Sequence, residues 1–305
     1  MHEFDDAWSR GRFSLVADNE LAEARFGAKY VREMLDKHGF KSSKSMGQNF
    51  LIDGNIPKKI VRLAGIDESC GILEVGPGIG SLTIELSRVA GRVTAVELDR
   101  RLLPLLSETL EGLHNVEVVQ GDILKLDINK LICEKMPGYE HHICANLPYN
   151  ITTPAISAFI KADAFVSMTI MVQKEVARRI CAGPGSSDYS AFSVFVQYYA
   201  QPQVLFDVPP ECFLPRPRVW SSVLMVKLRL ERFLEPEHEK AFFKVVRAAF
   251  NLRRKTLVNA LHSMFGDLMV KDDIAKIVYQ CGFDVQVRGE MLSIEDFALL
   301  SRFFK

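Results

Sequence analysis

The tetrapeptide Asn146-Leu147-Pro148-Tyr149 combines residue types that can hold an amine of a nucleobase. It follows a short apolar run, residues 142–145, which predicts a buried strand, and open α/β sheets bind their ligands at the carboxyl ends of strands. A rigid proline turn would aim the Asn146 side-chain oxygen and the Leu147 or Pro148 carbonyl at one point, and converging acceptors suit an exocyclic amine. The Tyr149 ring offers a face on which a base can stack. These four residues alone leave open an ordinary proline turn after a strand.

A glycine-rich segment, Glu74-Val-Gly76-Pro-Gly78-Ile-Gly80, follows the first predicted strand and opens a helix. Glycines there let the backbone turn tightly and approach a ligand closely. A dinucleotide-binding motif would have its third glycine at the position of Ser81, whereas the glycines here alternate. Glu97 ends the second strand about 20 residues later, which is the distance at which a carboxylate meets ribose hydroxyls.

Acceptor side chains end three predicted strands in a row. Asp122 follows the third strand, where its carboxylate is able to accept a hydrogen bond from an adenine amine. Together with Glu97, Asn146 and the glycine segment, and without a phosphate-binding lysine nearby, it indicates a nucleoside-type pocket. S-adenosylmethionine fits this pocket, because it carries ribose and adenine but no phosphate. The alternative is that Glu97 and Asp122 are helix N-caps.

Strand-like runs and amphipathic helices alternate along most of the chain, which predicts an α/β fold with a mostly parallel, doubly wound sheet. A proline-rich connector between the last two runs predicts an antiparallel end to the sheet. From residue 236 onward the pattern is helical. We therefore expect a lead-in over residues 1–40, an α/β domain over 41–235 and a small all-helical domain over 236–305. The predicted strands are residues 72–75, 93–97, 116–120, 142–145, 166–172, 194–199 and 223–228, and the helices between them include 82–87, 102–110 and 153–160.

Length and composition set broad limits on the protein class. The chain has 305 residues, enough for one α/β domain and a smaller second one. Lys plus Arg and Asp plus Glu both number 38, so net charge does not indicate a nucleic-acid partner. The six cysteines are scattered, which predicts free thiols in a reducing compartment, and no spacing predicts a metal site. No apolar run has membrane-spanning length and the acidic start is unlike a signal peptide, so we expect a cytoplasmic protein without membrane contact.

Charge is nevertheless uneven along the sequence. The charged residues within 41–62 are basic except Asp53, and residues 240–266 contain six lysines and arginines and no acidic residue. We interpret the second segment as a surface for RNA phosphates, although a solvated helix face is the alternative. The candidate RNA-binding residues are Lys244, Arg247, Arg253, Arg254 and Lys255.

The chain resembles the bacterial small-subunit rRNA adenine N6,N6-dimethyltransferases, which dimethylate two adjacent adenosines near the 3′ end of 16S rRNA. The resemblance implies a Rossmann-like sheet that uses S-adenosylmethionine without a metal, a helical C-terminal domain, and a monomer that acts on 16S rRNA within the 30S subunit or its precursor. The stretches that carry it are Ser45-Met-Gly-Gln-Asn-Phe-Leu-Ile-Asp53, Leu73-Glu-Val-Gly-Pro-Gly-Ile-Gly-Ser-Leu-Thr83, Val96-Glu-Leu-Asp99, Gly121-Asp122, Asn146-Leu-Pro-Tyr-Asn-Ile151, Gln173-Lys-Glu-Val-Ala177, Phe213-Leu-Pro-Arg-Pro-Arg-Val219 and Phe250-Asn-Leu-Arg-Arg-Lys-Thr-Leu257.

The resemblance also implies roles for single residues. Asn49 and Leu51 would flank the bound S-adenosylmethionine, and Gly76 would lie under its methionine portion. Gly78 would also belong to the cofactor site. The side chains at the strand ends would hold the rest, with Glu97 on the ribose, Asp122 on the adenine, and Asn146 between cofactor and target.

Aromatic residues would hold the target base. Stacking on Tyr149 and Phe213 would offset the loss of stacking in the RNA, although the residues alone favour Phe213 as a hydrophobic plug before a strand. Trp220 stands where the family usually has an acidic residue, so the resemblance gives it no role.

Two other functions remain possible at this point. One is a related methyltransferase that modifies adenine in 23S rRNA and confers macrolide resistance. The other is a non-catalytic ribosome-assembly or transcription factor on the same fold.

Overall fold

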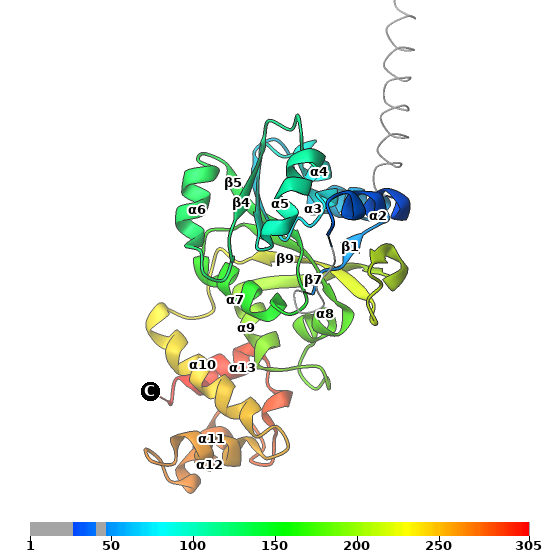
Figure 1. The fold of residues 1–305 in the computed structure, drawn as a ribbon. Helices are drawn as coiled ribbons and strands as arrows, with labels where there is room; N and C mark the ends of the chain where they lie inside the picture. Colours follow the sequence, from blue (N-terminus) through cyan, green and yellow to red (C-terminus); the bar gives the residue numbers. More distant parts are fainter. Residues whose placement is uncertain (1–26, 41–46, 305) are drawn as a thin grey trace, which may run out of the picture. The chain divides into compact units, whose positions relative to one another are not determined.

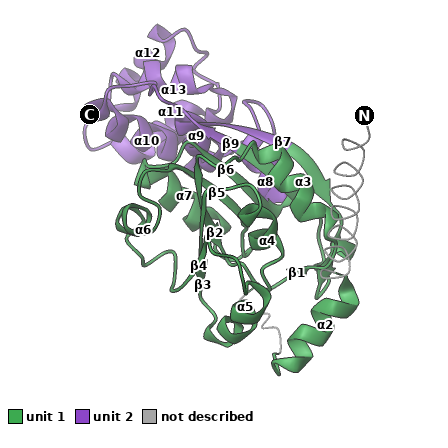
Figure 2. Ribbon diagram, turned by 90° about the horizontal axis from the view of Figure 1, so that it is seen from above, with its two compact units in different colours: residues 1–174, 205–225 green, residues 175–204, 226–305 purple. Residues whose placement is uncertain are grey.

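The computed structural model describes residues 27–40 and 47–304, which form two compact units (Figure 2). Unit 1 comprises residues 1–174 and 205–225, and unit 2 comprises residues 175–204 and 226–305. Unit 2 therefore contains the predicted helical segment 236–305 and also two stretches from before it. Each unit is described by itself.

A seven-stranded sheet with the strand order β4-β3-β2-β5-β6-β9-β7 is the centre of the fold (Figure 1). The pairs β4·β3, β3·β2, β2·β5 and β5·β6 are parallel, which confirms the predicted α/β architecture. Side chains of the inner strands are almost fully buried, as is typical of parallel strands covered by helices on both faces. The parallel strands are β2 Cys70–Val75, β3 Arg92–Glu97, β4 Val116–Gln120, β5 Glu140–Asn146 and β6 Ser167–Gln173.

Helices connect these strands, and polar side chains fix where several of them begin. Asp99 accepts a hydrogen bond from the Arg101 amide at the start of the 3-10 turn η2, and Asp127 caps α6 through the Lys130 amide. The three helices predicted between strands are confirmed as α4, α5 and α7. The helices of unit 1 are α2 Ala28–Lys37, α3 Asn55–Ala64, α4 Ser81–Ser87, α5 Leu103–Thr109 after η2 Arg100–Leu102, α6 Ile128–Lys135 and α7 Thr152–Ala162.

A second, two-stranded antiparallel sheet joins distant parts of unit 1. Its strands are β1 Phe50–Leu51 and β8 Phe213–Leu214, with Leu51 opposite Phe213. Both Leu51 and Phe213 are buried in the same hydrophobic cluster, beside Val61 and Leu82. This packing holds the segment before β1 against the sheet.

One predicted strand is wrong, because residues 194–199 lie in helix α9, Ala191–Tyr199. Ser190 caps this helix together with Ser193 in a reciprocal pair of hydrogen bonds, which is a helix start signal. The run is apolar and aromatic on several sides, so its periodicity does not separate a buried helix from a strand. The strand begins directly afterwards as β7 Ala200–Val208 and lies beside β9 Ser221–Leu228, whose prediction is confirmed. Their antiparallel arrangement stays a prediction.

The helices of unit 2 surround an aromatic core. Tyr198 and Phe242 are fully buried with ring centroids 4.8 Å apart, and Phe297 packs on Phe242 from another helix. From residue 236 to the end the described chain is helical, as predicted. The elements are α8 Lys174–Cys181, α9, α10 Pro236–Asn251, α11 Leu257–Phe265, α12 Lys271–Gln280, η4 Gly289–Met291 and α13 Ile294–Ser301.

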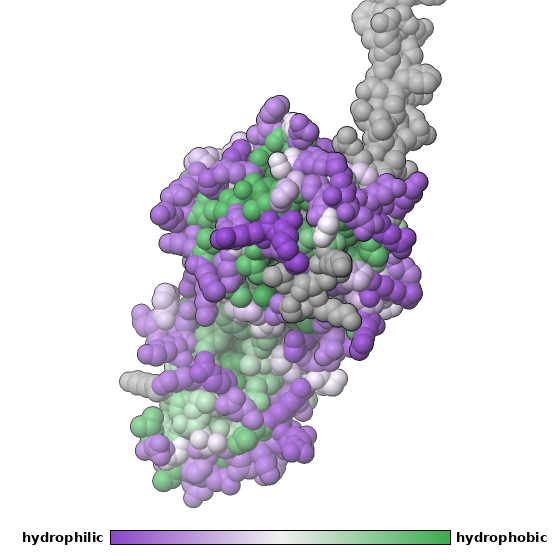
Figure 3. All heavy atoms as spheres, viewed as in Figure 1, coloured by the Kyte–Doolittle hydropathy of each residue, from purple (hydrophilic) through white to green (hydrophobic). Residues whose placement is uncertain are grey.

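Hydrophilic side chains cover most of the face shown in Figure 3, and hydrophobic ones reach it in patches. In unit 1 the exposed large hydrophobic residues include Leu98, Leu124 and Trp220. No helix within residues 27–40 and 47–304 has the length and apolar character needed to cross a membrane.

Gly91 lies directly before β3 and has no space for a side chain. A Cβ there would lie 2.2 Å from the Glu68 carbonyl oxygen and 2.3 Å from Tyr139 Cε1. We predict that Gly91→Ala destabilises the protein by about 1–3 kcal/mol, because a backbone carbonyl cannot yield as a flexible side chain does. Thermal unfolding followed by circular dichroism measures the change. Gly183→Ala is the control, since a Cβ at Gly183 meets nothing within 4 Å; equal midpoints for the two variants would contradict the prediction.

Candidate active site

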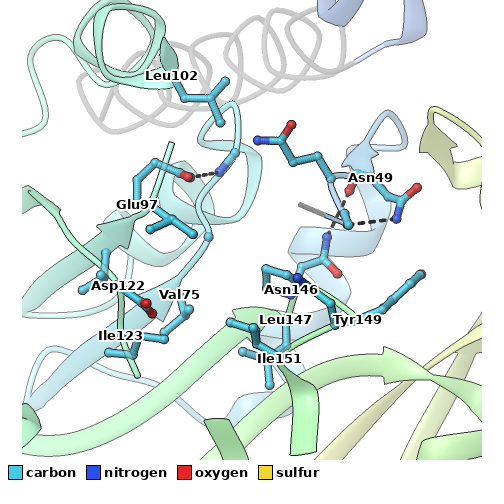
Figure 4. A pocket seen from close by; sticks show the side chains of 18 of the residues that line it. Asn49, Val75, Glu97, Leu102, Asp122, Ile123, Asn146, Leu147, Tyr149 and Ile151 are labelled. Atoms are coloured by element: carbon cyan, nitrogen blue, oxygen red, sulfur yellow. Dashed lines mark hydrogen bonds between the residues drawn. The ribbon is translucent and has the colours of Figure 1, made fainter. Parts of the chain in front are cut away.

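A cavity of about 270 Å³ lies at the carboxyl ends of β2, β3 and β5 (Figure 4). Figure 4 shows Glu97, Asp122 and Ile123 on one side, Asn49, Asn146, Leu147 and Tyr149 on the other, and Val75 between them. The sequence-predicted residues on its wall are Asn49, Gly76, Gly78, Glu97, Asp122, Asn146, Leu147, Pro148 and Tyr149.

Gly76 and Gly78, the first two of the alternating glycines, line this cavity. Gly76, Gly78 and Gly80 have φ values of 69°, 62° and 86°, a left-handed conformation that favours glycine. A Cβ on Gly78 would lie 3.0 Å from Phe50 Cδ1, and a Cβ on Gly76 would lie 3.4 Å from Pro148 Cγ. The glycines therefore serve both the turn into α4 and the close approach of neighbouring residues.

Glu97 ends β3 with its carboxylate nearly buried at the cavity wall. Its Oε1 accepts a hydrogen bond from the Asp99 amide at 2.8 Å, and its Oε2 faces the Gly78 amide at 3.4 Å. Burial raises the pKa of Glu97 despite these two amides. In contrast, hydrogen bonds from Arg101 hold the pKa of Asp99 at about 2. The N-cap of η2 is Asp99, whose side chain accepts the Arg101 amide, and not Glu97.

Asp122 lies across the cavity from the asparagine side. Its Oδ1 accepts the Leu124 amide at 3.1 Å, so the side chain stabilises the turn that follows β4. Its Oδ2 lies 3.6 Å from Lys125 Nζ. The carboxylate is only part-buried and lines the cavity, which leaves it able to accept a further hydrogen bond.

Asn146 is oriented by the segment that precedes β1. Its Nδ2 donates to the Asn49 carbonyl oxygen at 3.3 Å, and Asn49 Nδ2 in turn donates to the Gly47 carbonyl at 3.1 Å. A carbonyl oxygen only accepts hydrogen bonds, so it selects the amide nitrogen of Asn146. The opposite side-chain atom, Oδ1, is the acceptor, as the predicted amine site requires.

The following turn distinguishes the two candidate carbonyls. The Pro148 oxygen accepts hydrogen bonds from the Ile151 amide at 3.1 Å and from Thr152 Oγ1 at 3.3 Å. These two donors use both of its lone pairs, so Leu147 supplies the better second acceptor. The Tyr149 hydroxyl is within 2.7 Å of Ser221 Oγ, which fixes the ring at the cavity wall.

Two predicted residues lie outside this wall. Phe213 has 2% of its surface exposed and packs in the cluster with Leu51, so the structure gives it the role of a hydrophobic plug and not of an accessible stacking surface. Leu51 is also buried and lines only a smaller cavity of about 30 Å³ beneath the glycines. Both residues support the site from below through the β1·β8 pair.

Glu74 borders this smaller cavity and was given no role by the sequence analysis. It is fully buried, and its Oε2 has no hydrogen-bond partner among the described residues, as is true of Ser81 Oγ and Thr83 Oγ1 beside it. Burial raises the pKa of Glu74 to about 8. Glu74 is a carboxylate in an otherwise apolar strand, two residues before Gly76. This pattern is the sequence signal by which Glu74 is recognisable as a candidate site residue.

Comparison with known proteins places the chain in a family. A model of the family described as "Ribosomal RNA adenine dimethylase" matches residues 39–299. The chain belongs to this family. A protein of Alkaliphilus oremlandii named "Ribosomal RNA small subunit methyltransferase A" is 47% identical over 90% of this chain and 95% of its own length. The protein of the same name from Clostridioides difficile is 46% identical over 89% of this chain and 93% of its own length.

Solved structures agree on the fold. A dimethyladenosine transferase from Plasmodium falciparum is 25% identical, with a TM-score of 0.69 over 82% of this chain and 95% of that one. The 23S rRNA methyltransferase ErmE has a TM-score of 0.67 over 84% of this chain and 99% of that one. Its sequence is 24% identical, so this similarity shows the shared fold alone. The chain is thus an S-adenosylmethionine-dependent rRNA adenine dimethyltransferase.

The cavity of this dimethyltransferase fits S-adenosylmethionine, which is a cation at its sulfonium and amino groups. Among the described residues, the cavity wall carries the carboxylates Glu97 and Asp122 but no lysine or arginine. The unpartnered Glu74 Oε2 adds a buried acceptor beneath the glycines. No group of three or more potential metal ligands occurs in the part of the chain that the structure describes.

The basic residues predicted to bind RNA fall into two groups. Lys244 and Arg247 lie one turn apart on the exposed side of α10, and Arg254 and Lys255 are exposed after its end. Arg253 differs, because its guanidinium pairs with Glu290 at 2.5 Å and donates to the Ser186 and Ser187 carbonyls. Arg253 therefore joins three segments of unit 2. Of the other basic segment, residues 41–46 lie outside the described residues.

Burial of Glu74 makes stability depend on pH. Its pKa in the folded protein is about 8 and lies above the ordinary value of 4.5, so the folded state holds a proton that the unfolded state loses between these pH values. The free energy of unfolding of the cofactor-free protein should therefore fall as pH rises from about 4.5 to 8. We predict that Glu74→Gln reduces this fall, and that its melting temperature relative to wild type rises with pH.

The contrasting variant is Glu117→Gln. The pKa of Glu117 is lowered by Lys135 and Arg92, so its charge stabilises the fold at neutral pH and this stabilisation is lost in acid. Glu117→Gln should lower the melting temperature at pH 7, with the difference shrinking as pH falls. Parallel melting curves for wild type and Glu74→Gln across pH 5–9 would contradict a raised pKa at Glu74.

Proposed function

We propose that this enzyme dimethylates the N6 amines of two adjacent adenosines near the 3′ end of 16S rRNA, in the 30S subunit or its precursor. The observation that carries this proposal is the 47% identity, over nine-tenths of the chain, to a protein named for the small-subunit reaction. The similarity to the 23S rRNA enzyme is confined to the fold and does not favour that substrate. We further propose that it acts as a monomer in the cytoplasm.

The proposed cofactor contacts follow the wall of the cavity. Glu97 holds the ribose hydroxyls, for which its buried carboxylate is a strong acceptor, and Asp122 accepts from the adenine amine. Gly76 and Gly78 allow the methionine portion to lie against the backbone, with Asn49 and Leu51 beside it. Glu74 borders the small cavity beneath the glycines and would offer a buried carboxyl to this end of the pocket.

Asn146 and Leu147 act on the target amine. When bound, S-adenosylmethionine supplies an electrophilic methyl group on sulfur. The adenine amine is a poor nucleophile because its lone pair is delocalised into the ring. Asn146 Oδ1 and the Leu147 carbonyl accept hydrogen bonds from its two N–H groups. These hydrogen bonds favour a tetrahedral nitrogen and fix its direction of approach to the methyl group. Tyr149, held by Ser221, supplies the face on which the extruded base stacks.

The test is methyl transfer from labelled S-adenosylmethionine to isolated ribosomal subunits that lack these methyl groups. We predict label on 16S rRNA of small subunits and none on large subunits. Asn146→Ala should lower the rate by about 10²- to 10³-fold, because it removes an acceptor that acts on the reacting nitrogen. Equal labelling of 50S material would overturn the assignment to the small subunit.

Cofactor affinity separates the role of Asn146 from damage to the pocket. Asn146→Ala should bind S-adenosylmethionine nearly as wild type does in calorimetry, whereas Glu97→Gln should bind it weakly, since a neutral amide is a poorer partner for the ribose hydroxyls. Loss of binding in both variants would mean that Asn146 acts mainly on the cofactor.

We propose that Lys244 and Arg247 on α10, with Arg254 and Lys255, contact phosphates of the rRNA. Each contact releases counterions, so the double variant Lys244→Gln/Arg247→Gln should flatten the dependence of log K on log salt by about 0.7 per lost contact on single strands. Binding to small subunits at several salt concentrations gives the slope.

The matched control is Lys276→Gln on α12. Lys276 is exposed but pairs with Asp273 at 3.0 Å. The Lys276→Gln variant should leave the slope of log K against log salt unchanged. If the double variant has the same salt dependence of binding as wild type, Lys244 and Arg247 on α10 do not contact RNA phosphates.

A further inference from the structure

Trp220 is a large aromatic residue on the surface of unit 1, next to the catalytic turn. The residue is 48% exposed, and it directly precedes β9, which begins at Ser221. The family resemblance gives this residue no role. Its half-exposed indole offers a large apolar area to a binding partner.

Hydrogen bonds on both sides of Trp220 fix its backbone. The Trp220 carbonyl accepts from the Lys174 amide at 2.9 Å. Ser222 Oγ donates to Asp207 Oδ1 at 2.6 Å, and Lys174 Nζ reaches the other oxygen of Asp207 at 2.5 Å. The ring is therefore carried on a rigid strand start and not on a loose loop.

The same strand start touches the catalytic turn. Ser221, the next residue, bonds to the Tyr149 hydroxyl at 2.7 Å, and Tyr149 lines the cavity. Trp220 itself is not part of the cavity wall. It thus lies near the catalytic turn but outside the space proposed for the target adenine and the cofactor.

One face of the indole has a cation beside it. Lys174 Nζ lies 5.5 Å from the ring centroid, within the range of a cation–π contact. Arg218, two residues earlier, is exposed. A flat aromatic surface with positive charge at its side is the combination that binds unpaired nucleic acid, where bases stack on the ring and cations meet the phosphates.

The burial of Phe213 sharpens this assignment. Phe213 belongs to the same connecting segment, but its ring is enclosed with Leu51 and is unavailable for stacking. Trp220 is the aromatic side chain of that segment that reaches solvent.

We propose that Trp220 stacks on an unpaired base that neighbours the target adenosine in the rRNA. This rests on the proposed function, because it concerns the RNA that enters the same site. The stack holds the neighbouring nucleotide outside the cavity while the target base is inside. Trp220 is a substrate-positioning residue with no part in methyl transfer.

The experiment compares Trp220→Leu with Trp220→Phe, both measured with small subunits that lack the methyl groups. Loss of a base stack should weaken binding by roughly 5- to 150-fold in Trp220→Leu, which is apolar but has no aromatic face. Trp220→Phe should recover most of the affinity. KM for the subunit should rise in the same order, with kcat and the Kd for S-adenosylmethionine unchanged. Tyr279→Ala, an exposed aromatic on α12, is the control and should bind as wild type.

Each other outcome is decisive. If Leu and Phe bind equally well, the ring does not stack, and Trp220 is only an apolar surface residue. If kcat falls while KM stays constant, Trp220 acts through Tyr149 and the proposal is wrong. If the wild-type enzyme fails to methylate small subunits, the proposed function is wrong. If the wild-type enzyme is active and both Trp220 variants bind small subunits as it does, only the proposed stacking role of Trp220 is wrong.

Discussion

The parallel pairing of β2 with both β3 and β5 is the constraint on which the site depends. In this register Glu74 lies opposite Ala95 and Leu73 opposite Ile143, so all three strands reach the same edge of the sheet before they end. At its carboxyl end each strand gives way to a turn, so glycines and polar side chains are accommodated at this edge more readily than within the buried strands. The cavity is thus the place where the buried sheet ends.

A second constraint comes from outside the sheet. The segment 47–49 is held by the β1·β8 pair and offers one carbonyl, that of Asn49, to Asn146. That carbonyl determines which end of the Asn146 amide faces the cavity. Leu51 and Phe213 act at a distance from the chemistry, since their burial keeps the carbonyl in place. The catalytic geometry therefore depends on hydrophobic packing between segments that lie far apart in the sequence.

Local signals predicted the elements whose chemistry is local. Alternating glycines, apolar runs and the polar residues that follow them were sufficient to place most of the predicted strands and the polar side chains at their ends on the cavity wall. The failures concern properties that depend on neighbours distant in sequence. Residues 194–199 are apolar on several sides because unit 2 encloses α9, so no periodicity identified a helix. The burial of Phe213 and the pairing of Arg253 with Glu290 likewise depend on residues distant in sequence, and the ligand roles predicted for these two residues stay predictions.

The carboxyl groups of the cavity are compatible with a cationic donor. Glu74 and Glu97 both have raised pKa values because burial penalises their charged forms, and Glu97 also raises the pKa of Glu74. The sheet register that brings the strand ends together also brings these carboxyls together, and no described lysine or arginine on the wall compensates them. A phosphate-bearing cofactor would add negative charge to this surface, whereas a sulfonium with an amino group offsets it. The absence of lysine and arginine from the described wall is thus consistent with the ligand class that its hydrogen-bond acceptors suit.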